Sequence, residues 1–337
     1  MQLVTGGTGL VGAHLLFRLT EREQILRASF RSEKRIQKVR ELFHWLDPDT
    51  AEHRLSLIQW QSCDLLDITA VEELCEGVTE IFHCAAMVSF HPADKWKLLE
   101  QNPRMTALLV NQALHQGVEQ FNYVSSVAAL GRPPQGEEGQ PIDEQNIWKD
   151  DPDHSVYAQS KYLAEMEVWR GMEEGLNAAM VNPGIILGPG FPDEGSSSIF
   201  GLVQRGFRYY TPGLNGFVDV RDVVEGLLKI SENRLHQERF ILVADSIAYR
   251  WLFSRIAEAL HKKLPDKAAK AWMIQLIRRV HWLREKLGGR KATITRETAA
   301  SAVRISRYKN RKSIEQLALQ YRPLRETVEW VCSSMRA

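Results

Sequence analysis

A glycine-rich turn at the start of the chain is the feature that most restricts how this sequence folds. Residues 1–21 read MQLVTGGTGLVGAHLLFRLTE, with apolar Leu3 and Val4 before the glycines and apolar residues at helical spacing after them. This pattern predicts a short buried strand, a tight turn and a helix. Glycine allows the positive φ that such a turn needs. The helix would present free N–H groups and the positive end of its dipole at the turn, which is the geometry that binds a phosphate.

The glycines fit two overlapping spacings that are typical of dinucleotide binding. Gly7-x-Gly9-x-x-Gly12 is one, and Gly6-x-x-Gly9-x-x-Gly12 is a looser version. In both, the pyrophosphate lies against the helix N-terminus and meets no Cβ atom. The residues predicted to line the cofactor here are Gly6, Thr8, Gly9, Leu10, Val11 and Gly12.

The residues after the second predicted strand, 25–30, determine which dinucleotide fits. An NAD site places a carboxylate here for the ribose 2′-hydroxyl, whereas this chain has Arg31, followed by Ser32, Lys34 and Arg35. Cations at this place would bind a 2′-phosphate, so we expect NADP(H) as the preferred cofactor and NAD(H) as the alternative. A solvated start of a basic helix would have the same composition, and this interpretation stays open.

Strand and helix patterns alternate along the first two-thirds of the chain. This alternation predicts right-handed crossovers and a parallel sheet that binds ligands at the carboxyl ends of its strands. Further strands are expected at 55–60, 80–86, 120–126 and 177–183. The cofactor-binding residues expected at the strand ends are Asp64, Leu65, Ala85, Ala86 and Pro183. Asp64 would accept a hydrogen bond from the adenine amino group or, alternatively, cap a turn.

Only the first part of the chain carries these motifs, which indicates two domains in an α/β protein. We expect a Rossmann-type doubly wound parallel sheet in residues 1–187, with part of 216–245 returning to it. Residues 188–215 and 246–337 would form a smaller, mixed C-terminal domain that binds the substrate. The loop 131–155 is rich in Pro, Gly and acidic residues, and loops of this length are usually functional lids.

Composition excludes several classes of protein. Cys63, Cys75, Cys84 and Cys332 lack the spacing of a metal site, which predicts reduced thiols in a cytoplasmic protein and no bound metal. The sequence begins with a strand-like segment instead of a signal peptide, and no apolar run approaches the roughly 18 residues of a membrane span. The net charge is only +1, and we expect no nucleic-acid partner.

Positive charge is concentrated in one segment of the C-terminal third. Residues 262–312 hold 16 Lys and Arg against 3 Asp and Glu, whereas residues 1–261 hold 24 against 36. Within the segment, residues 267–289 carry an apolar stripe at helical spacing among basic residues. Such a helix would cover the core of the substrate domain, which we favour, or lie on a membrane surface.

Six motifs together resemble a known family. TGGTGLVG, CDLLD, HCAA, YVSS, YAQSK and NPGIILGPG occur in the order and approximate spacing of the extended short-chain dehydrogenases/reductases, over about residues 1–230. These belong to the NAD-dependent epimerase/dehydratase superfamily, in which NPGIILGPG is most similar to the dihydroflavonol 4-reductase and cinnamoyl-CoA reductase branch. The resemblance also implies a homodimer formed by two helices of each subunit.

The resemblance implies a Ser-Tyr-Lys catalytic triad. Tyr157 and Lys161 match the family's Tyr-x-x-x-Lys, and on a helix they share one face. Counting back from Gly131 gives Ser126 as the serine, with Ser125 as the second candidate. The tyrosine would protonate the alkoxide left by hydride transfer, and the lysine ammonium would lower its pKa from about 10. In the family the lysine also holds the nicotinamide ribose, while the serine hydroxyl fixes the substrate oxygen.

The reaction expected from the resemblance is the NADPH-dependent reduction of a small-molecule ketone or aldehyde. Sugar dehydratases carry an Asp-Glu pair directly after the serine, where this chain has Val127 and Ala128. A nucleotide-sugar epimerase with tightly held NAD(P) is the first alternative, although epimerases typically have Tyr-Phe-Asn where this chain has MVNPG. A non-catalytic NADP-sensing protein is the second alternative.

Three further polar residues have less specific interpretations. His83 follows a predicted strand and is expected to pack or hydrogen-bond locally. His91 lies on the next loop, where it would line a substrate pocket. Asp222 precedes an apolar helical pattern and is expected to cap that helix.

Overall fold

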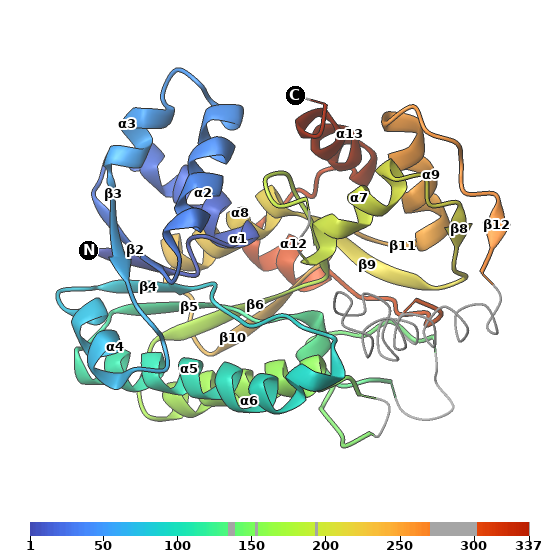
Figure 1. Cartoon of the computed structure of the whole chain (residues 1–337). Coiled ribbons are helices and arrows are strands. Elements are labelled where there is room, and N and C mark those ends of the chain that lie inside the picture. Colours follow the sequence, from blue (N-terminus) through green and yellow to red (C-terminus); the bar gives the residue numbers. More distant parts are fainter. Residues whose placement is uncertain (134–138, 152–153, 193–194, 270–301, 337) are drawn as a thin grey trace.

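A parallel sheet of seven strands lies at the centre of the molecule in the computed structural model, which describes residues 1–133, 139–151, 154–192, 195–269 and 302–336 (Figure 1). The strand order is β10-β6-β5-β4-β1-β2-β3. The strands are β1 (Gln2–Thr5), β2 (Leu26–Phe30), β3 (Ile58–Ser62), β4 (Glu80–His83), β5 (Gln120–Val124), β6 (Ala178–Pro183) and β10 (Glu238–Leu242). The order reverses between β1 and β4, so the carboxyl ends of these two strands border the crevice where such sheets bind ligands.

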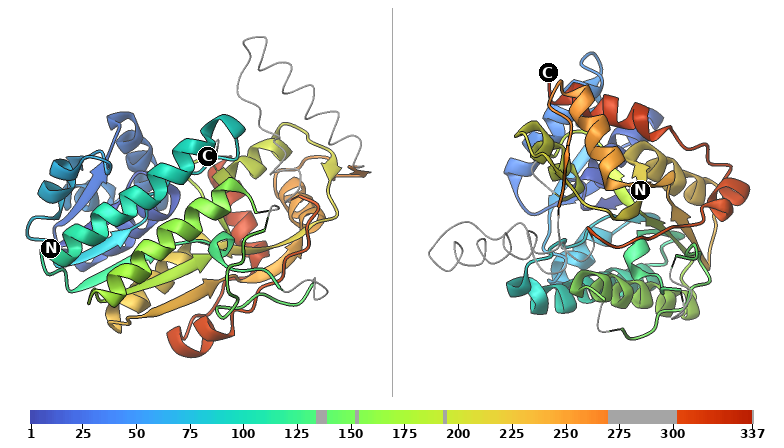
Figure 2. Two further views of the ribbon diagram at one scale, coloured as in Figure 1. Left: turned by 90° about the horizontal axis from the view of Figure 1, so that it is seen from below. Right: turned by 90° about the vertical axis from the view of Figure 1, so that its right-hand side faces the viewer.

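Helices cover both faces of this sheet, as Figures 1 and 2 show. One face carries α1 (Leu10–Leu19), α2 (Glu33–Leu46), α3 (Ala51–Ser56) and α8 (Val220–Glu232). The other face carries α4 (Ile68–Cys75), α5 (Lys95–His115) and α6 (Val156–Glu173). Each face has its own apolar core, with Leu16 and Phe43 in the first and Leu109 and Val168 in the second. This arrangement confirms the predicted doubly wound α/β sheet.

Strand β3 begins later than the predicted 55–60. Leu55 and Ser56 complete the last turn of α3 instead, because Leu55 is buried from the helix in the same core as Phe43. The strands expected at 80–86 and 120–126 end earlier, at His83 and Val124. The residues that follow both strands therefore leave the sheet and are available to form a site.

A smaller, mixed sheet follows, as predicted. Strand β9 (Leu214–Asp219) pairs in parallel with β7 (Ile185–Leu187) and antiparallel with β11 (Asp245–Ala248). A two-stranded piece joins β8 (Tyr209–Tyr210) to β12 (Lys267–Ala268). The helices packed around this part are α7 (Ser198–Gln204), α9 (Tyr249–Ala259) and α13 (Leu324–Ser334). None of the helices in the described residues is long and apolar enough to cross a membrane.

The chain returns to the large sheet after β9. Helix α8 packs beside α1, and β10 pairs with β6 at the edge of the sheet. Helix α12 (Arg311–Leu317) lies against β10. The remaining short elements are the 3-10 turns η1 (Thr20–Arg22), η2 (Pro92–Asp94), η3 (Val127–Ala129) and η4 (Gly195–Ser197). The boundaries proposed for the two domains stay a prediction.

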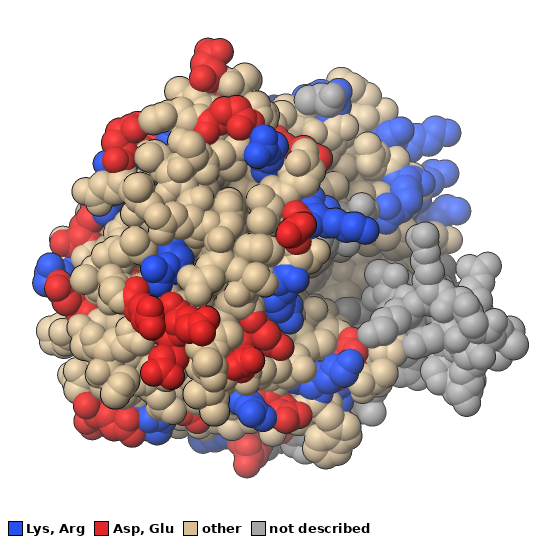
Figure 3. Space-filling view, turned by 60° about the vertical axis from the view of Figure 1, so that its left-hand side comes forward, with Lys and Arg blue, Asp and Glu red and all other residues tan. Residues whose placement is uncertain are grey.

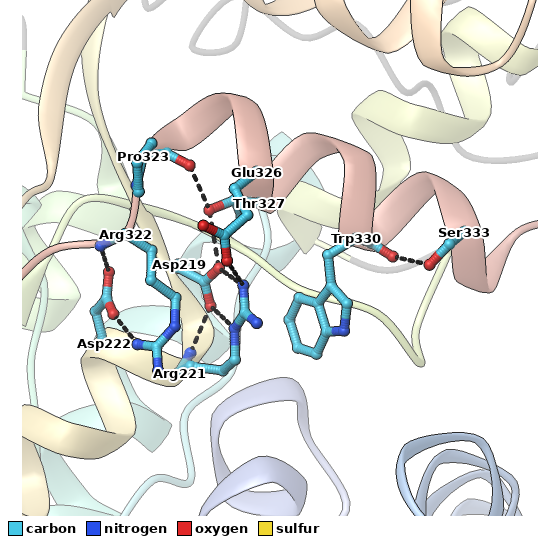
Figure 4. A network of polar contacts seen from close by, with 9 residues as sticks. All are labelled: Asp219, Arg221, Asp222, Arg322, Pro323, Glu326, Thr327, Trp330 and Ser333. Atoms are coloured by element: carbon cyan, nitrogen blue, oxygen red, sulfur yellow. Dashed lines mark hydrogen bonds and ion pairs between the residues drawn. The ribbon is translucent and has the colours of Figure 1, made fainter.

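A polar network fixes α13 to the start of α8 (Figure 4). Asp219, which is fully buried, caps α8 by accepting from the backbone N–H of Arg221 at 2.8 Å and also binds its guanidinium at 2.7 Å. The Thr327 hydroxyl of α13 donates to Asp219 at 2.8 Å, and the Arg221 guanidinium lies 3.8 Å from the centre of the Trp330 ring. The network thus joins two segments that lie about a hundred residues apart.

The prediction that Asp222 caps α8 is wrong. Asp219 occupies the N-cap position because the helix begins three residues earlier, at Val220. Asp222 instead accepts a hydrogen bond from the backbone N–H of Arg322 at 3.0 Å and pairs with the Arg322 guanidinium. Its role is still structural, but it connects two segments of the chain instead of ending a helix.

Candidate active site

The glycine turn forms a cradle between β1, α1 and the end of β4. Gly6 has φ +68°, and a Cβ on it would lie 2.7 Å from the Cα of Ala85. A Cβ on Gly12 would lie 2.2 Å from the carbonyl oxygen of Gly6. Gly9 is the N-cap of α1, and no side chain caps it. The close approaches and the helix cap therefore fall on the glycines of the Gly6-x-x-Gly9-x-x-Gly12 spacing.

This cradle fits the pyrophosphate of a dinucleotide. The first N–H groups of α1 have no capping side chain, so they remain donors for an anion at the positive end of the helix dipole. Around a Cβ built on Gly9, the nearest atom is the Gly6 carbonyl oxygen at 3.4 Å, which leaves the approach to the turn open. Leu10 is half-buried at the start of α1, whereas Thr8 and Val11 are buried.

The other predicted cofactor residues follow the carboxyl ends of the strands. Ala85 and Ala86 are half-buried just after β4, and Pro183 ends β6 as a buried residue. Leu65 is buried in the core beneath α4 and α5. Asp64 is exposed after β3 and accepts a hydrogen bond from the N–H of Leu66 at 3.1 Å, so it does cap a turn. Its contact with adenine stays a prediction.

Arg31 and Lys34 lie between the end of β2 and the first turn of α2. Both side chains are exposed, and no ion pair involves either of them in the described part of the chain. The N-cap of α2, Ser32, makes no side-chain capping bond. The two cations and the open helix start are thus available for an anion such as a 2′-phosphate, and the preference for NADP(H) stays a prediction.

Tyr157 lies in the first turn of α6, where Ser155 caps the helix by accepting from the N–H of Ala158 at 3.0 Å. Its ring is half-buried and lies in an edge-to-face contact with the Phe90 ring, with 5.3 Å between the ring centres. Burial raises the pKa of Tyr157, while hydrogen bonding to the Ser126 hydroxyl opposes the rise. Ser126 therefore lies close enough to Tyr157 to influence its phenol, and a joint catalytic role for the two residues stays a prediction.

The structure separates the two candidate serines. Ser125 is buried and its hydroxyl donates to Glu165 at 2.5 Å, which directs it away from Tyr157. Ser126 is half-buried, caps the short turn η3 by accepting from the N–H of Ala128 at 3.1 Å, and interacts with Tyr157. The geometry favours Ser126, although its catalytic role stays a prediction.

Lys161 lies one turn further along α6, with only 2% of its surface exposed. Its ammonium donates to the hydroxyl of Tyr123 at 2.8 Å and to the carbonyl of Val124 at 2.9 Å. Burial lowers the pKa of Lys161 to about 7, and the carboxylate of Glu165 acts against this shift. An ammonium with three donors still has one bond to give after these two contacts.

A buried carboxylate on the same helix escaped the sequence reasoning. Glu165 is fully buried one turn beyond Lys161 and accepts from Ser125, from Asn182 Nδ2 at 2.8 Å and from Arg239 at 2.9 Å. The signal was present in the sequence, because residues 157, 161 and 165 share one helix face. Asn182 also donates to the carbonyl of Ser126 at 3.0 Å, which fixes the serine loop.

The two histidines have local roles. His83 is buried between the hydroxyls of Thr5 at 2.7 Å and Thr106 at 3.2 Å, and its ring stacks on Tyr123. Burial lowers the pKa of His83 to about 3, so this side chain is neutral, in agreement with the expected local packing. His91 caps η2 by accepting from the N–H of Ala93 at 3.2 Å. No group of metal-binding side chains occurs in the described residues.

The described part of the loop 131–155 is anchored to the body of the molecule. Trp148 stacks between His154 at 3.9 Å and Tyr162 of α6 at 4.5 Å, measured between ring centres. Arg239 of β10 donates to the carbonyls of Glu144 and Asn146. The loop is therefore tied both to α6 and to the edge of the large sheet.

The basic helix expected at 267–289 lies mostly outside the described residues. Lys267 and Ala268 are described and belong to β12, so the predicted helix does not include them. On the face shown in Figure 3, Lys and Arg side chains gather near one edge, while acidic and basic side chains alternate elsewhere. Contact of the 267–289 segment with a membrane stays a prediction.

Comparison with known proteins gives a family and several relatives. The model of the NAD dependent epimerase/dehydratase family matches residues 2–243. Sterol demethylase protein B of Methylococcus capsulatus is 29% identical, over 72% of this chain and 69% of that protein. A protein of Synechocystis sp., provisionally named a dihydroflavonol 4-reductase, is 28% identical over 96% of this chain and 91% of its own. Cinnamoyl-CoA reductase 1 of Petunia hybrida is 26% identical over 78% and 77%.

Solved structures share the whole fold. The crystal structure of gox2253 matches with a TM-score of 0.79 and 28% identity, over 100% of this chain and 98% of that one. The UDP-glucose 4-epimerase of Thermotoga maritima matches with a TM-score of 0.74 and 18% identity, over 99% and 98%. At that lower identity the likeness establishes the architecture alone.

Proposed function

We propose, since the chain belongs to the NAD dependent epimerase/dehydratase family, that it is an NADPH-dependent reductase of a ketone or an aldehyde. Family membership and the reductase relatives make it an NAD(P)-dependent enzyme of the oxidoreductase type that acts on a small molecule. The observation that supports the finer proposal is the arrangement of the three residues: Lys161 is buried one helical turn after Tyr157 on α6, and Ser126 lies close enough to Tyr157 to influence the pKa of its phenol.

The three side chains have distinct tasks in this reaction. The nicotinamide, when bound, supplies the hydride to the carbonyl carbon. Tyr157 donates its phenolic proton to the carbonyl oxygen, which the Ser126 hydroxyl holds in place. Burial raises the pKa of Tyr157, so the proton stays on the phenol until negative charge develops on that oxygen. The Lys161 ammonium then stabilises the phenolate.

The loop after β4 supports an apolar carbonyl substrate. The Phe90 ring contacts the Tyr157 ring and is 38% exposed, and Val88 on the same loop is 55% exposed. Exposed apolar side chains next to a reacting hydroxyl are typical of a pocket for an aromatic or aliphatic molecule. A nucleotide-sugar would instead need hydrogen-bonding groups at this place.

Preference for NADPH is supported by the two cations after β2. Arg31 and Lys34 are exposed after β2, where dinucleotide-binding sheets of this type place the residue that contacts the 2′ position of the adenosine ribose. A guanidinium can donate two parallel hydrogen bonds to two oxygens of a phosphate. A ribose hydroxyl has only one oxygen and cannot accept such a pair. The homodimer implied by the family resemblance remains a further proposal.

The test is a screen of carbonyl compounds and nucleotide-sugars in which absorbance of the reduced nicotinamide is followed. A reductase consumes NADPH in proportion to the carbonyl compound added. An epimerase converts a nucleotide-sugar without net consumption, and a sensing protein binds NADPH but turns over neither class. Either of the last two results would replace the proposal.

A further inference from the structure

Glu165 lies at the centre of the polar contacts behind the proposed triad. Its Oε2 accepts from the hydroxyl of Ser125 at 2.5 Å and from Asn182 at 2.8 Å. Its Oε1 accepts from Arg239 at 2.9 Å and from the indole N–H of Trp169 at 3.4 Å. The partners come from the end of β5, from β6, from β10 and from α6 itself, so this one side chain connects three neighbouring strands to the catalytic helix.

Most of these contacts favour a carboxylate at Glu165. Asn182 Nδ2, the Arg239 guanidinium and the Trp169 indole can only donate hydrogen bonds. They bind both carboxylate oxygens, so a proton on either oxygen would face a donor. The side chain is fully buried, which makes a mispaired proton costly. A negative charge is therefore fixed one helical turn from Lys161.

Lys161 has no other anion near it in the described chain. The titratable groups that face it are Tyr123 from β5, His83 and Cys84 from the end of β4, and Tyr157 and Glu165 from α6. Burial raises the pKa values of both tyrosines and of the thiol, and lowers that of His83, so these four groups are neutral at pH 7. The neighbouring α5 contributes the uncharged Asn102 and Thr106.

We infer that Glu165 is a positioning residue: its buried carboxylate, one helical turn from Lys161 on α6, keeps the ammonium of that lysine charged inside the site. This inference rests on the proposed function, because it concerns the lysine that activates Tyr157. Without the carboxylate, the largest influence that opposes burial would be lost, and the pKa of Lys161 would fall further. Lys161 would then lose the charge that stabilises the Tyr157 phenolate at neutral pH.

A purely structural role for Glu165 is the competing explanation, since the carboxylate also pairs with Arg239 across 2.9 Å. Arg239 in turn holds the loop 131–155 through the carbonyls of Glu144 and Asn146. The two explanations differ in what Arg239→Gln does. That variant breaks the same ion pair but keeps the carboxylate, so it matches the structural damage without removing the charge that acts on Lys161.

The experiment measures the titration of Lys161 directly. Protein labelled with ¹³C at the lysine ε-carbons is followed by NMR as the pH is raised, and the Lys161 signal is identified by its loss in Lys161→Met. Three variants are compared with wild type: Glu165→Gln, Arg239→Gln and the double variant. The double variant removes both members of the pair, so no buried charge is left without a partner and folding is protected.

In Glu165→Gln and in the double variant, the Lys161 midpoint is expected to fall by at least about one pH unit, and in Arg239→Gln it should not fall. The descent of kcat/KM at high pH should move to lower pH by the same amount, in the same variants only. An unchanged midpoint in the folded double variant would overturn the inference, as would an equal fall in Arg239→Gln. Because the NMR titration needs no substrate, a wild type that reduces no carbonyl compound would count against the proposed function alone.

Discussion

Replacing Arg31 by Asp tests the cofactor assignment at a single exposed position. Arg31 follows β2 and lies next to α2, whose N-cap makes no side-chain capping bond. Asp would remove the donors for a 2′-phosphate and set a carboxylate against it. The same carboxylate would offer an acceptor to the ribose 2′-hydroxyl of NADH. The variant should therefore prefer NADH to NADPH, while the site around Tyr157 stays unchanged.

The size of the effect follows from the exposure of Arg31. A hydrogen bond to a charged group contributes about 1.5–3 kcal/mol, and solvent around an exposed guanidinium favours the lower end, about 1.5 kcal/mol. Repulsion between the new carboxylate and the phosphate adds about 1 kcal/mol at 4 Å in water. Together these give roughly 2.5 kcal/mol, or about a 60-fold weaker binding of NADPH.

The assay is a fluorescence titration of wild type, Arg31→Asp and a control with both reduced cofactors. Arg104→Asp is a suitable control, because Arg104 is exposed on α5 and its ion pair with Glu100 spans 3.8 Å at the surface. It changes net charge equally but lies on the opposite face of the large sheet from α2, so both affinities should stay near those of wild type. If wild-type protein binds NADH as tightly as NADPH, or if Arg31→Asp leaves NADPH binding unchanged, the assignment of Arg31 is wrong. A partial loss of NADPH affinity would point to Lys34 as a second contact. Replacing both Arg31 and Lys34 should then complete that loss.

Three other changes give separate tests. Tyr157→Phe should retain NADPH affinity by fluorescence and lower kcat by about 10²- to 10⁴-fold, the usual contribution of a general acid, and unchanged turnover would contradict the mechanism. Gly12→Ala should abolish cofactor binding and lower Tm, since its Cβ would lie 2.2 Å from the Gly6 carbonyl oxygen; normal NADPH affinity in this variant would disprove the cradle. Asp222→Ala should reduce the free energy of unfolding in urea by about 2 kcal/mol through loss of two charge-assisted bonds to Arg322, and a change below the error of the measurement would show that the network adds nothing.

The parts of the fold that sequence could predict are those set by local patterns. The glycine turn and the Tyr157–Lys161 pair depend on spacings within one or two turns of chain, and both lie where they were expected. The alternation of strands and helices likewise gave the doubly wound sheet. Strand β3 was misplaced because Leu55 satisfies a strand pattern and a helix pattern equally, and only its burial against the core favours the helix.

The contacts behind the site could not be found in this way, because they join distant segments. Glu165 meets Arg239 across 74 residues and Ser125 across 40. Whether Ser125 or Ser126 faces Tyr157 depends on the residue at which β5 ends, and sequence patterns place such ends only within a few residues. The exchange of roles between Asp219 and Asp222 has the same origin, since the cap moved with the first residue of α8.

The polar network between α13 and α8 can form only late in the synthesis of this protein. Asp219 binds Thr327, which is synthesised 108 residues later, and Asp222 binds Arg322, which is synthesised 100 residues later. At a ribosome speed of about 5–20 residues per second, the glycine turn and α6 leave the ribosome several seconds before this polar network can form. A chain that stopped early would carry both carboxylates without these partners. Proteases that survey unfinished chains would thus meet an open molecule, although every proposed catalytic residue is already in it.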